Sequence, residues 1–353
     1  MDKPIFPVFL SCQGACLTDE EKYLFNKINP LGVCLFSNYC NNIQTKQQIK
    51  ALIKEIKEII GRENVLIAID QEGGRVNRLI TSEFMSLSSQ SEIKNEQQAE
   101  EHAYLTSYEL KNCDINVNFA PVLDIEYNIT SSVLHTRCFT GNEKTVAKFG
   151  KAMVDKYIEY GICPCLKHLP GHGRARVDPH LDTSVIYDSI NILQKDFYPF
   201  KQLNKSPMGM LGHVVIDVVD KDIPSTFSRK VIENIVRKEI GFDGLLVSDA
   251  LIMKALKGTL IEKAERAISS GCDVLCLGNA KFEENIEICK SNICLRDEAY
   301  ERLNKVYSIL QNEKTFDNYE QIKNNYCVNM KSMIAYDTKY DATEVLNRIR
   351  NNE

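Results

Sequence analysis

Short apolar runs of four to seven residues recur along the chain, each bounded by residues that favour turns. Runs of this length between turn signals are typical of strands buried in a sheet. We predict eight strands, over residues 4–10, 32–36, 65–69, 115–119, 163–166, 208–212, 244–247 and 273–277. Eight strands within about 280 residues restrict the chain to few architectures.

The segments between these strands have helical periodicity and end in glycine. Apolar residues within 49–60 recur every three or four positions, and Gly61 then ends the pattern shortly before a strand. Helical patterns end in the same way before Gly161, Gly241 and Gly271. A helix that ends at glycine and leads into a strand is the repeating unit of parallel α/β proteins. The strand count favours a (β/α)8 barrel of the TIM type over a doubly wound sheet.

We predict a single domain, because no linker rich in glycine, serine or proline divides the chain. Residues 1–280 would form the barrel. Residues 281–353 are polar, rich in asparagine and lysine, and helical in pattern. We expect the last barrel helix and a C-terminal helical extension there.

Charge and hydropathy exclude two classes of partner. A net charge of −5 and a pI near 5.8 leave no broad basic surface for nucleic acid. No apolar run approaches the roughly 18 residues of a membrane-spanning helix. Residues 4–12 are interpreted as a first strand rather than an export signal, because the apolar run is short and carries two prolines. With its cysteines interpreted as free thiols, we expect a cytoplasmic protein. We also expect it to be a monomer.

Ionisable residues stand at the C-terminal ends of several predicted strands, where barrel enzymes assemble their sites. They are Asp70, Lys167, His168, His213 and Asp249, with Arg137 in a long connection after the fourth strand. An aspartate at a strand end often caps the following helix, and Asp249 alone fits that role. Several ionisable residues on one rim favour a catalytic site instead.

The stretch KHLPGHGRARVDPH, residues 167–180, contains four side chains that could bind zinc. They are His168, His172, Asp178 and His180. Their spacings match no common zinc motif, and Lys167, Arg174 and Arg176 would repel a dication. The stretch also lacks the spaced glycines and the terminal Lys-Ser/Thr of a phosphate-binding loop. We expect no metal and no other cofactor, and a metal-dependent hydrolase remains the alternative that a chelator would test.

Asp178 and His180 favour another interpretation of this stretch. Pro179 biases Asp178 toward an extended backbone, in which residues two apart project to the same side. The carboxylate would then bind one imidazole nitrogen and leave the other to deliver a proton. This arrangement predicts a general acid carried on a loop.

Five motifs together resemble glycoside hydrolase family 3, and specifically its bacterial β-N-acetylglucosaminidases of the NagZ type. They are IDQEGGRV (69–76), FAPVLDI (119–125), KHLPGHG (167–173), VDPH (177–180) and GFDGLLVSDALIM (241–253). The resemblance extends from about residue 6 to residue 280. It implies a retaining β-N-acetylhexosaminidase built on a barrel.

The resemblance also implies roles for individual residues. Asp249 matches the nucleophile that forms a covalent glycosyl-enzyme, and Asp178 and His180 match the dyad that serves as acid and then base. The positions that hold the sugar hydroxyls are matched by Asp70, Arg137, Lys167 and His168. Where the family often has Asp-Asp and Arg-Asn, this chain has Asp249-Ala250 and Ser37-Asn38. The second departure is expected to alter contacts beyond the first sugar.

The substrate implied by the resemblance is a peptidoglycan fragment, N-acetylglucosaminyl-1,6-anhydro-N-acetylmuramic acid with or without its peptide. Removal of its terminal N-acetylglucosamine would serve cell-wall recycling. Two alternatives use the same residues: a phosphorylase, in which phosphate replaces water, and a sugar-binding barrel without turnover. The sequence does not separate hydrolysis from phosphorolysis.

Overall fold

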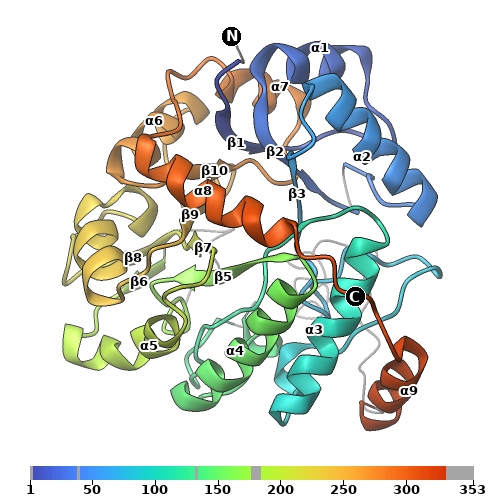
Figure 1. Ribbon diagram of the computed structural model, residues 1–353. Helices are drawn as coiled ribbons and strands as arrows, with labels where there is room; N and C mark the ends of the chain where they lie inside the picture. The colour runs from blue at the N-terminus through green and yellow to red at the C-terminus, as the bar shows by residue number, and fades with distance from the viewer. Residues whose placement is uncertain (1–2, 38–39, 132–133, 176–183, 331–353) are drawn as a thin grey trace, which may run out of the picture.

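The computed structural model describes residues 3–37, 40–131, 134–175 and 184–330. Eight parallel strands close into a barrel in the order β1-β10-β9-β7-β5-β4-β3-β2 (Figure 1). They are β1 (Phe6–Leu10), β2 (Pro30–Leu35), β3 (Leu66–Ile69), β4 (Val117–Asn118), β5 (Cys163–Leu169), β7 (Met208–Leu211), β9 (Leu245–Ala250) and β10 (Val274–Cys276). Each overlaps one of the eight predicted runs, so the predicted (β/α)8 barrel is confirmed.

A second, two-stranded sheet was not predicted. It pairs β6 (Ser184–Ile186) with β8 (Val214–Ile216) in parallel, next to the barrel. Each strand has three residues, too few for an alternating pattern to show in the sequence. Only two residues separate β8 from β7, so no turn signal marks its start.

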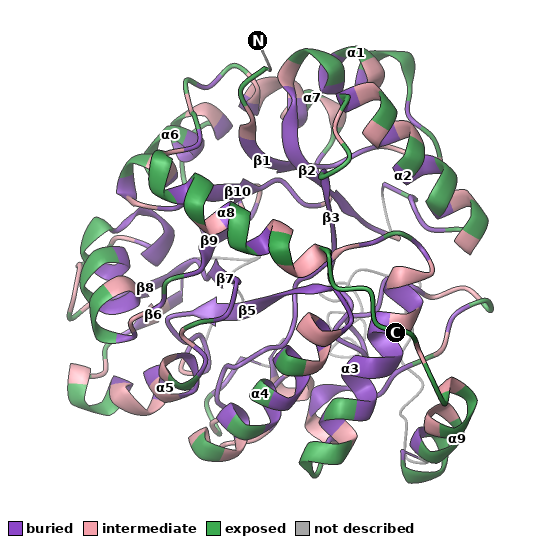
Figure 2. Ribbon diagram, viewed as in Figure 1, coloured by how far each residue is buried: buried purple, intermediate pink, exposed green. Residues whose placement is uncertain are grey.

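The barrel is surrounded by helices whose inner faces are apolar. In chain order the longer ones are α1 (Asp19–Ile28), α2 (Lys46–Ile60), α3 (Glu96–Lys111), α4 (Glu143–Glu159), α5 (Ile190–Gln202), the π-helix η4 (Val231–Glu239), α6 (Leu260–Ser270), α7 (Phe282–Ile288), α8 (Asp297–Leu310) and α9 (Tyr319–Asn329). Figure 2 shows buried strands at the centre and helices that are buried on their inward side and exposed outward.

Local sequence signals set the ends of these helices. Helix α2 begins after Thr45, whose side chain accepts a hydrogen bond from the Gln48 N–H, and it ends at Gly61 with a left-handed φ of 78°. Helix α6 begins with a capping box between Thr259 and Glu262. These caps satisfy backbone groups that the helices themselves leave unpaired.

Helix α8 closes the end of the barrel at which the strands begin. Its apolar side chains Ala299, Leu303 and Val306 join the cluster that fills the barrel interior. Arg302 of this helix and Arg296 just before it contact the buried carboxylate of Asp273, at 3.0 and 2.8 Å. Figure 1 shows α8 lying across this end, which leaves the opposite end of the barrel for the site.

Helix α9 packs beside α3 on the outside of the barrel (Figure 1). Tyr319 of α9 stacks on Tyr108 of α3, with ring centroids 3.7 Å apart. The predicted extension at 281–353 thus includes α7, α8 and α9 as far as the structure describes it, and the boundary at residue 280 remains a prediction.

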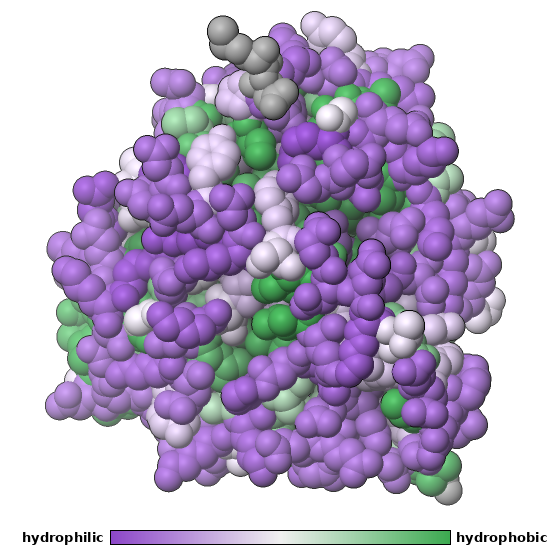
Figure 3. Space-filling model, in the orientation of Figure 1, coloured by the Kyte–Doolittle hydropathy of each residue, from purple (hydrophilic) through white to green (hydrophobic). Residues whose placement is uncertain are grey.

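The surface seen from the α8 side is mostly hydrophilic, with hydrophobic residues gathered near its centre (Figure 3). Among the helices that the structure describes, none is long and apolar enough to cross a membrane.

Candidate active site

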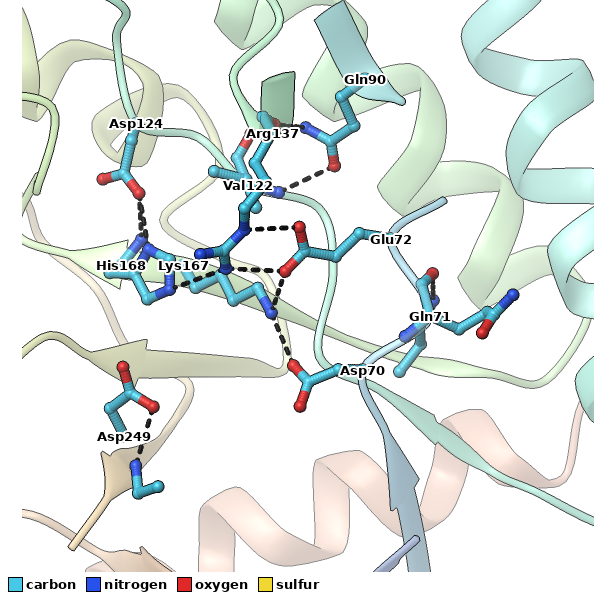
Figure 4. Close-up of polar contacts among 12 residues, drawn as sticks. Asp70, Gln71, Glu72, Gln90, Val122, Asp124, Arg137, Lys167, His168 and Asp249 are labelled. Atoms are coloured by element: carbon cyan, nitrogen blue, oxygen red, sulfur yellow. Dashed lines mark hydrogen bonds and ion pairs between the residues drawn. The ribbon is translucent and has the colours of Figure 1, made fainter. Parts of the chain in front are cut away.

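The ionisable residues predicted at strand ends converge at one end of the barrel. Asp70 directly follows β3, Lys167 and His168 lie in β5, and Asp249 lies in β9. Arg137 belongs to a 3₁₀ turn, His135–Arg137, in the connection between β4 and α4. Figure 4 shows these side chains around one space, with the Asp249 carboxylate pointing from β9 toward Lys167 and His168.

Lys167 is held between two carboxylates. Its Nζ donates to Asp70 Oδ1 at 2.7 Å and to Glu72 Oε1 at 2.6 Å, and the Lys167 and Glu72 side chains are almost completely buried. Burial by itself would lower the pKa of Lys167, but the charges of Asp70 and Glu72 raise it above its ordinary value. The ammonium group is therefore charged and fixed in direction.

Glu72 connects this lysine to Arg137. The guanidinium donates from Nε and from one terminal nitrogen to the two Glu72 oxygens, both at 2.8 Å (Figure 4). Burial would raise the pKa of Glu72, but Arg137 and Lys167 together hold it far below its ordinary value. One buried carboxylate thus positions two cations at the barrel mouth.

His168 is oriented by Asp124, which follows β4. The His168 Nδ1 lies 2.6 Å from Asp124 Oδ2, and its Nε2 lies 3.3 Å from Arg137. Because arginine only donates, Nε2 accepts and the imidazole proton sits on Nδ1. Asp124 also accepts from the backbone N–H of His172 at 2.6 Å. The two histidines of the KHLPGHG motif are thereby fixed by the same carboxylate.

Asp249 is partly exposed, and its Oδ1 accepts a hydrogen bond from the N–H of Ala250 at 2.7 Å. The capping role that its sequence position allowed is wrong, because the following helix, α6, is capped by Thr259. The carboxylate lies close enough to His172 for its charge to act on that imidazole. Burial lowers the pKa of His172 to about 4, so a neutral ring stands near Asp249.

His213 supports the backbone beside Asp249. Its Nε2 lies 3.1 Å from the carbonyl oxygen of Ala250, and its Nδ1 lies 2.8 Å from Thr226 Oγ1. A carbonyl only accepts, so the proton sits on Nε2 and the histidine holds the end of β9.

Sequence reasoning did not select Glu72 and Asp124, although it quoted the motifs that contain them. Glu72 lies two positions beyond Asp70 in IDQEGGRV, and Asp124 is the one ionisable residue of FAPVLDI. In an extended segment, side chains two positions apart project to the same side, and this rule would have placed Glu72 beside Asp70.

Asp178 and His180 lie outside the described residues, so their predicted role rests on the sequence alone. Within the described parts of the chain, no three histidine, cysteine, aspartate or glutamate side chains are grouped to hold a metal ion.

Replacing Glu72 by glutamine is expected to destabilise the fold by about 3–5 kcal/mol, because the buried Lys167 and the partly buried Arg137 would lose their shared anion. The NH2 group of the new amide would also face N–H groups of Lys167 or Arg137, which only donate, so no hydrogen bond could form there. Urea unfolding measures the change. Glu63→Gln is the matched control. The Glu63 side chain is 97% exposed, and the substitution weakens a surface ion pair with Lys57 at 3.9 Å. Equal stability of the two variants would contradict the bridging role of Glu72.

Comparisons with known proteins identify the family of the chain. Residues 13–312 match the family model described as glycosyl hydrolase family 3 N terminal domain. A Beta-hexosaminidase of Bordetella avium is 33% identical over 293 residues, which cover 78% of this chain and 81% of the relative. A Beta-hexosaminidase of Psychromonas ingrahamii is 34% identical over 288 residues, which cover 77% of this chain and 82% of the relative.

Solved structures show the same likeness. NagZ from Neisseria gonorrhoeae, in complex with N-trifluoroacetyl-D-glucosamine, superposes with a TM-score of 0.80 at 28% identity, covering 94% of this chain and 97% of that one. A glycoside hydrolase family 3 β-N-acetylglucosaminidase from Paenibacillus gives a TM-score of 0.75 at 25% identity, covering 97% and 66%. The chain therefore belongs to glycoside hydrolase family 3, with the β-hexosaminidases of the NagZ type, and is a glycoside hydrolase.

Proposed function

We propose that this chain is a retaining exo-β-N-acetylglucosaminidase that acts through a covalent glycosyl-enzyme on Asp249. One observation carries the proposal: the Asp249 carboxylate faces the cluster of Lys167, His168 and Asp70 across the barrel mouth (Figure 4). A nucleophile opposite a set of fixed donors and acceptors suits a sugar whose hydroxyls are held while its anomeric carbon is attacked.

The cluster has the chemistry to hold a hexose. Lys167 has three N–H donors, and its contacts with Asp70 and Glu72 account for two of them. Asp70 presents a partly exposed carboxylate, which accepts from hydroxyl groups. Arg137 and His168 lie beside them on the same rim. In this proposal the four residues orient the ring, and Glu72 and Asp124 hold them in place.

The first chemical step forms a bond between an Asp249 oxygen and C1 of the sugar as the glycosidic bond breaks. His180 gives its proton to the departing oxygen, so the aglycone leaves as a neutral alcohol. In the second step His180 takes a proton from water, the water oxygen attacks C1, and the Asp249 carboxylate is released. Two inversions at C1 give net retention of configuration.

The substrate proposed is N-acetylglucosaminyl-1,6-anhydro-N-acetylmuramic acid, with or without its peptide, cleaved by a monomer in the cytoplasm during cell-wall recycling. Support for the terminal sugar comes from the NagZ relative, whose structure holds N-trifluoroacetyl-D-glucosamine. Hydrolysis is favoured over the phosphorolysis that the sequence left open, because the curated relatives are named as hexosaminidases.

A 5-fluoro N-acetylglucosaminyl fluoride is expected to label the protein with one glycosyl group, because the fluorine slows release of the intermediate. Mass spectrometry of the digested protein should place the label on the peptide that contains Asp249. A label elsewhere, or none during slow turnover, would contradict the mechanism.

A second measurement separates hydrolysis from phosphorolysis. The proposed peptidoglycan fragment, a muropeptide, is incubated with the protein in phosphate buffer and in phosphate-free buffer, and the products are compared. A sugar 1-phosphate formed in phosphate buffer would support the phosphorylase.

A further inference from the structure

A buried hydrogen-bond network connects helix α9 to the candidate active site. Tyr326 of α9 has no exposed surface, although most of that helix is exposed. Its hydroxyl oxygen lies 2.9 Å from His102 Nδ1, and the other ring nitrogen of His102 lies 3.0 Å from the carbonyl oxygen of Glu72. This helix lies beyond residue 312, where the match to the family model ends.

The direction of each hydrogen bond in this network follows from its chemistry. The Glu72 carbonyl only accepts, so His102 Nε2 carries the proton. Burial lowers the pKa of His102 to about 4, which keeps the ring neutral, and Nδ1 is then an acceptor. Tyr326 therefore donates its hydroxyl proton to Nδ1. Its oxygen in turn accepts from the backbone N–H and the hydroxyl of Ser88, at 3.1 and 2.7 Å.

The turn that carries Glu72 packs closely against His102 and Ser88. Gly73 has a left-handed φ of 94°, and a side chain there would lie 2.2 Å from the Ser88 carbonyl oxygen and 2.8 Å from His102 Cε1. The turn thus has no room to move toward either residue. A displacement of His102 or Ser88 would shift the backbone of Glu72, and with it the carboxylate that holds Lys167 and Arg137.

The same segment also reaches Arg137 directly. Gln90, two residues after Ser88, donates from its side-chain amide to the carbonyl oxygens of Arg137 and Val122, both at 3.0 Å (Figure 4). Gln90 also accepts from the Val122 N–H at 3.0 Å. Tyr326 thus fixes one end of a short segment whose other end supports the arginine.

We propose that Tyr326, acting through His102, is a positioning residue of the active site that holds Glu72 where it can orient Lys167 and Arg137 toward the substrate. The inference rests on the proposed role of that cluster in sugar binding. It assigns helix α9 a part in activity in addition to its packing on α3.

Two substitutions of His102 separate positioning from packing. In His102→Gln, the side-chain amide N–H lies near the position of Nε2 and keeps the bond to the Glu72 carbonyl. In His102→Asn, the side-chain oxygen lies near the position of Nδ1 and keeps only the bond to Tyr326. We expect His102→Asn to lower kcat/KM on an aryl N-acetyl-β-glucosaminide by about 10- to 100-fold, because small displacements of substrate-holding groups are costly. His102→Gln loses only the bond to Tyr326, so it should lose no more than the roughly tenfold expected when that bond alone is broken, with a similar thermal midpoint in both variants.

Tyr326→Phe tests the other end of the network and keeps the ring that lies against His102, at 6.0 Å between centroids. It should lower kcat/KM by roughly tenfold. The matched control is Tyr319→Phe on the same helix, whose hydroxyl donates to Glu109 and not to the network. Its kcat/KM should equal that of wild type.

The outcomes distinguish this inference from the proposed function. If wild type does not cleave the aryl glycoside, the proposed function fails. If wild type cleaves it and Tyr326→Phe matches Tyr319→Phe, the positioning role fails alone. Equal losses in His102→Gln and His102→Asn would also overturn it, since a purely structural histidine would show that result. If His102→Asn does not fold, the comparison of Tyr326→Phe with Tyr319→Phe tests the positioning role by itself.

Discussion

Asp249→Ala is expected to lower kcat/KM by on the order of 10⁴-fold or more on every glycoside substrate, whatever its leaving group. The variant lacks the oxygen that bonds to C1, so neither an activated nor a natural aglycone can restore the first step. Steady-state rates on a dinitrophenyl glycoside and on the muropeptide measure the loss.

Azide makes this test specific for a nucleophile. In Asp249→Ala a small anion can occupy the space left by the carboxylate and attack C1 from that face. A β-glycoside would then give the α-glycosyl azide, by a single inversion. Asp243→Ala is the matched control, because this exposed aspartate pairs with Lys305 at the opposite end of the barrel. Full activity in Asp249→Ala, or azide product of the β configuration, would contradict the assignment.

The barrel could be predicted from sequence because its strands are buried on both faces and read as continuous apolar runs. The same logic placed Asp70, Lys167 and Asp249 at one rim, since parallel strands end together. Arg137 was different: it lies in a short turn of a long connection, so the sequence pattern placed it only near this rim, and its sugar-binding role came from the family resemblance.

Residues that act through burial and pairing were harder to find. Glu72 matters because it lies within reach of the buried Lys167 and the partly buried Arg137, and no local pattern records that Glu72 will be buried. Tyr326 belongs to a polar helix in which it is the one described buried residue, so the sequence pattern indicated only a polar helical extension. Both roles depend on contacts between segments far apart in the chain, which hydrophobic spacing does not encode.

His180→Ala is expected to lose about 10²- to 10⁴-fold in activity on the natural disaccharide and much less on a dinitrophenyl glycoside. The natural alcohol needs a proton to leave, whereas dinitrophenolate leaves without one. A plot of kcat/KM against the pKa of the leaving group should therefore be steep for the variant and shallow for wild type. Equal losses on the two substrates would contradict the acid role, and thermal unfolding serves as the control for folding.

The base role of the same histidine predicts a second effect. With a dinitrophenyl aglycone the first step stays fast in His180→Ala, but water then attacks without a base, so the glycosyl-enzyme on Asp249 should accumulate after a burst. Azide needs no base and should speed release. Because it attacks a linkage already inverted once, its product should have the β configuration, opposite to that from Asp249→Ala. The two variants thus place Asp249 on one face of C1 and His180 on the other. If both variants gave the same anomer of the glycosyl azide, the double displacement would be excluded.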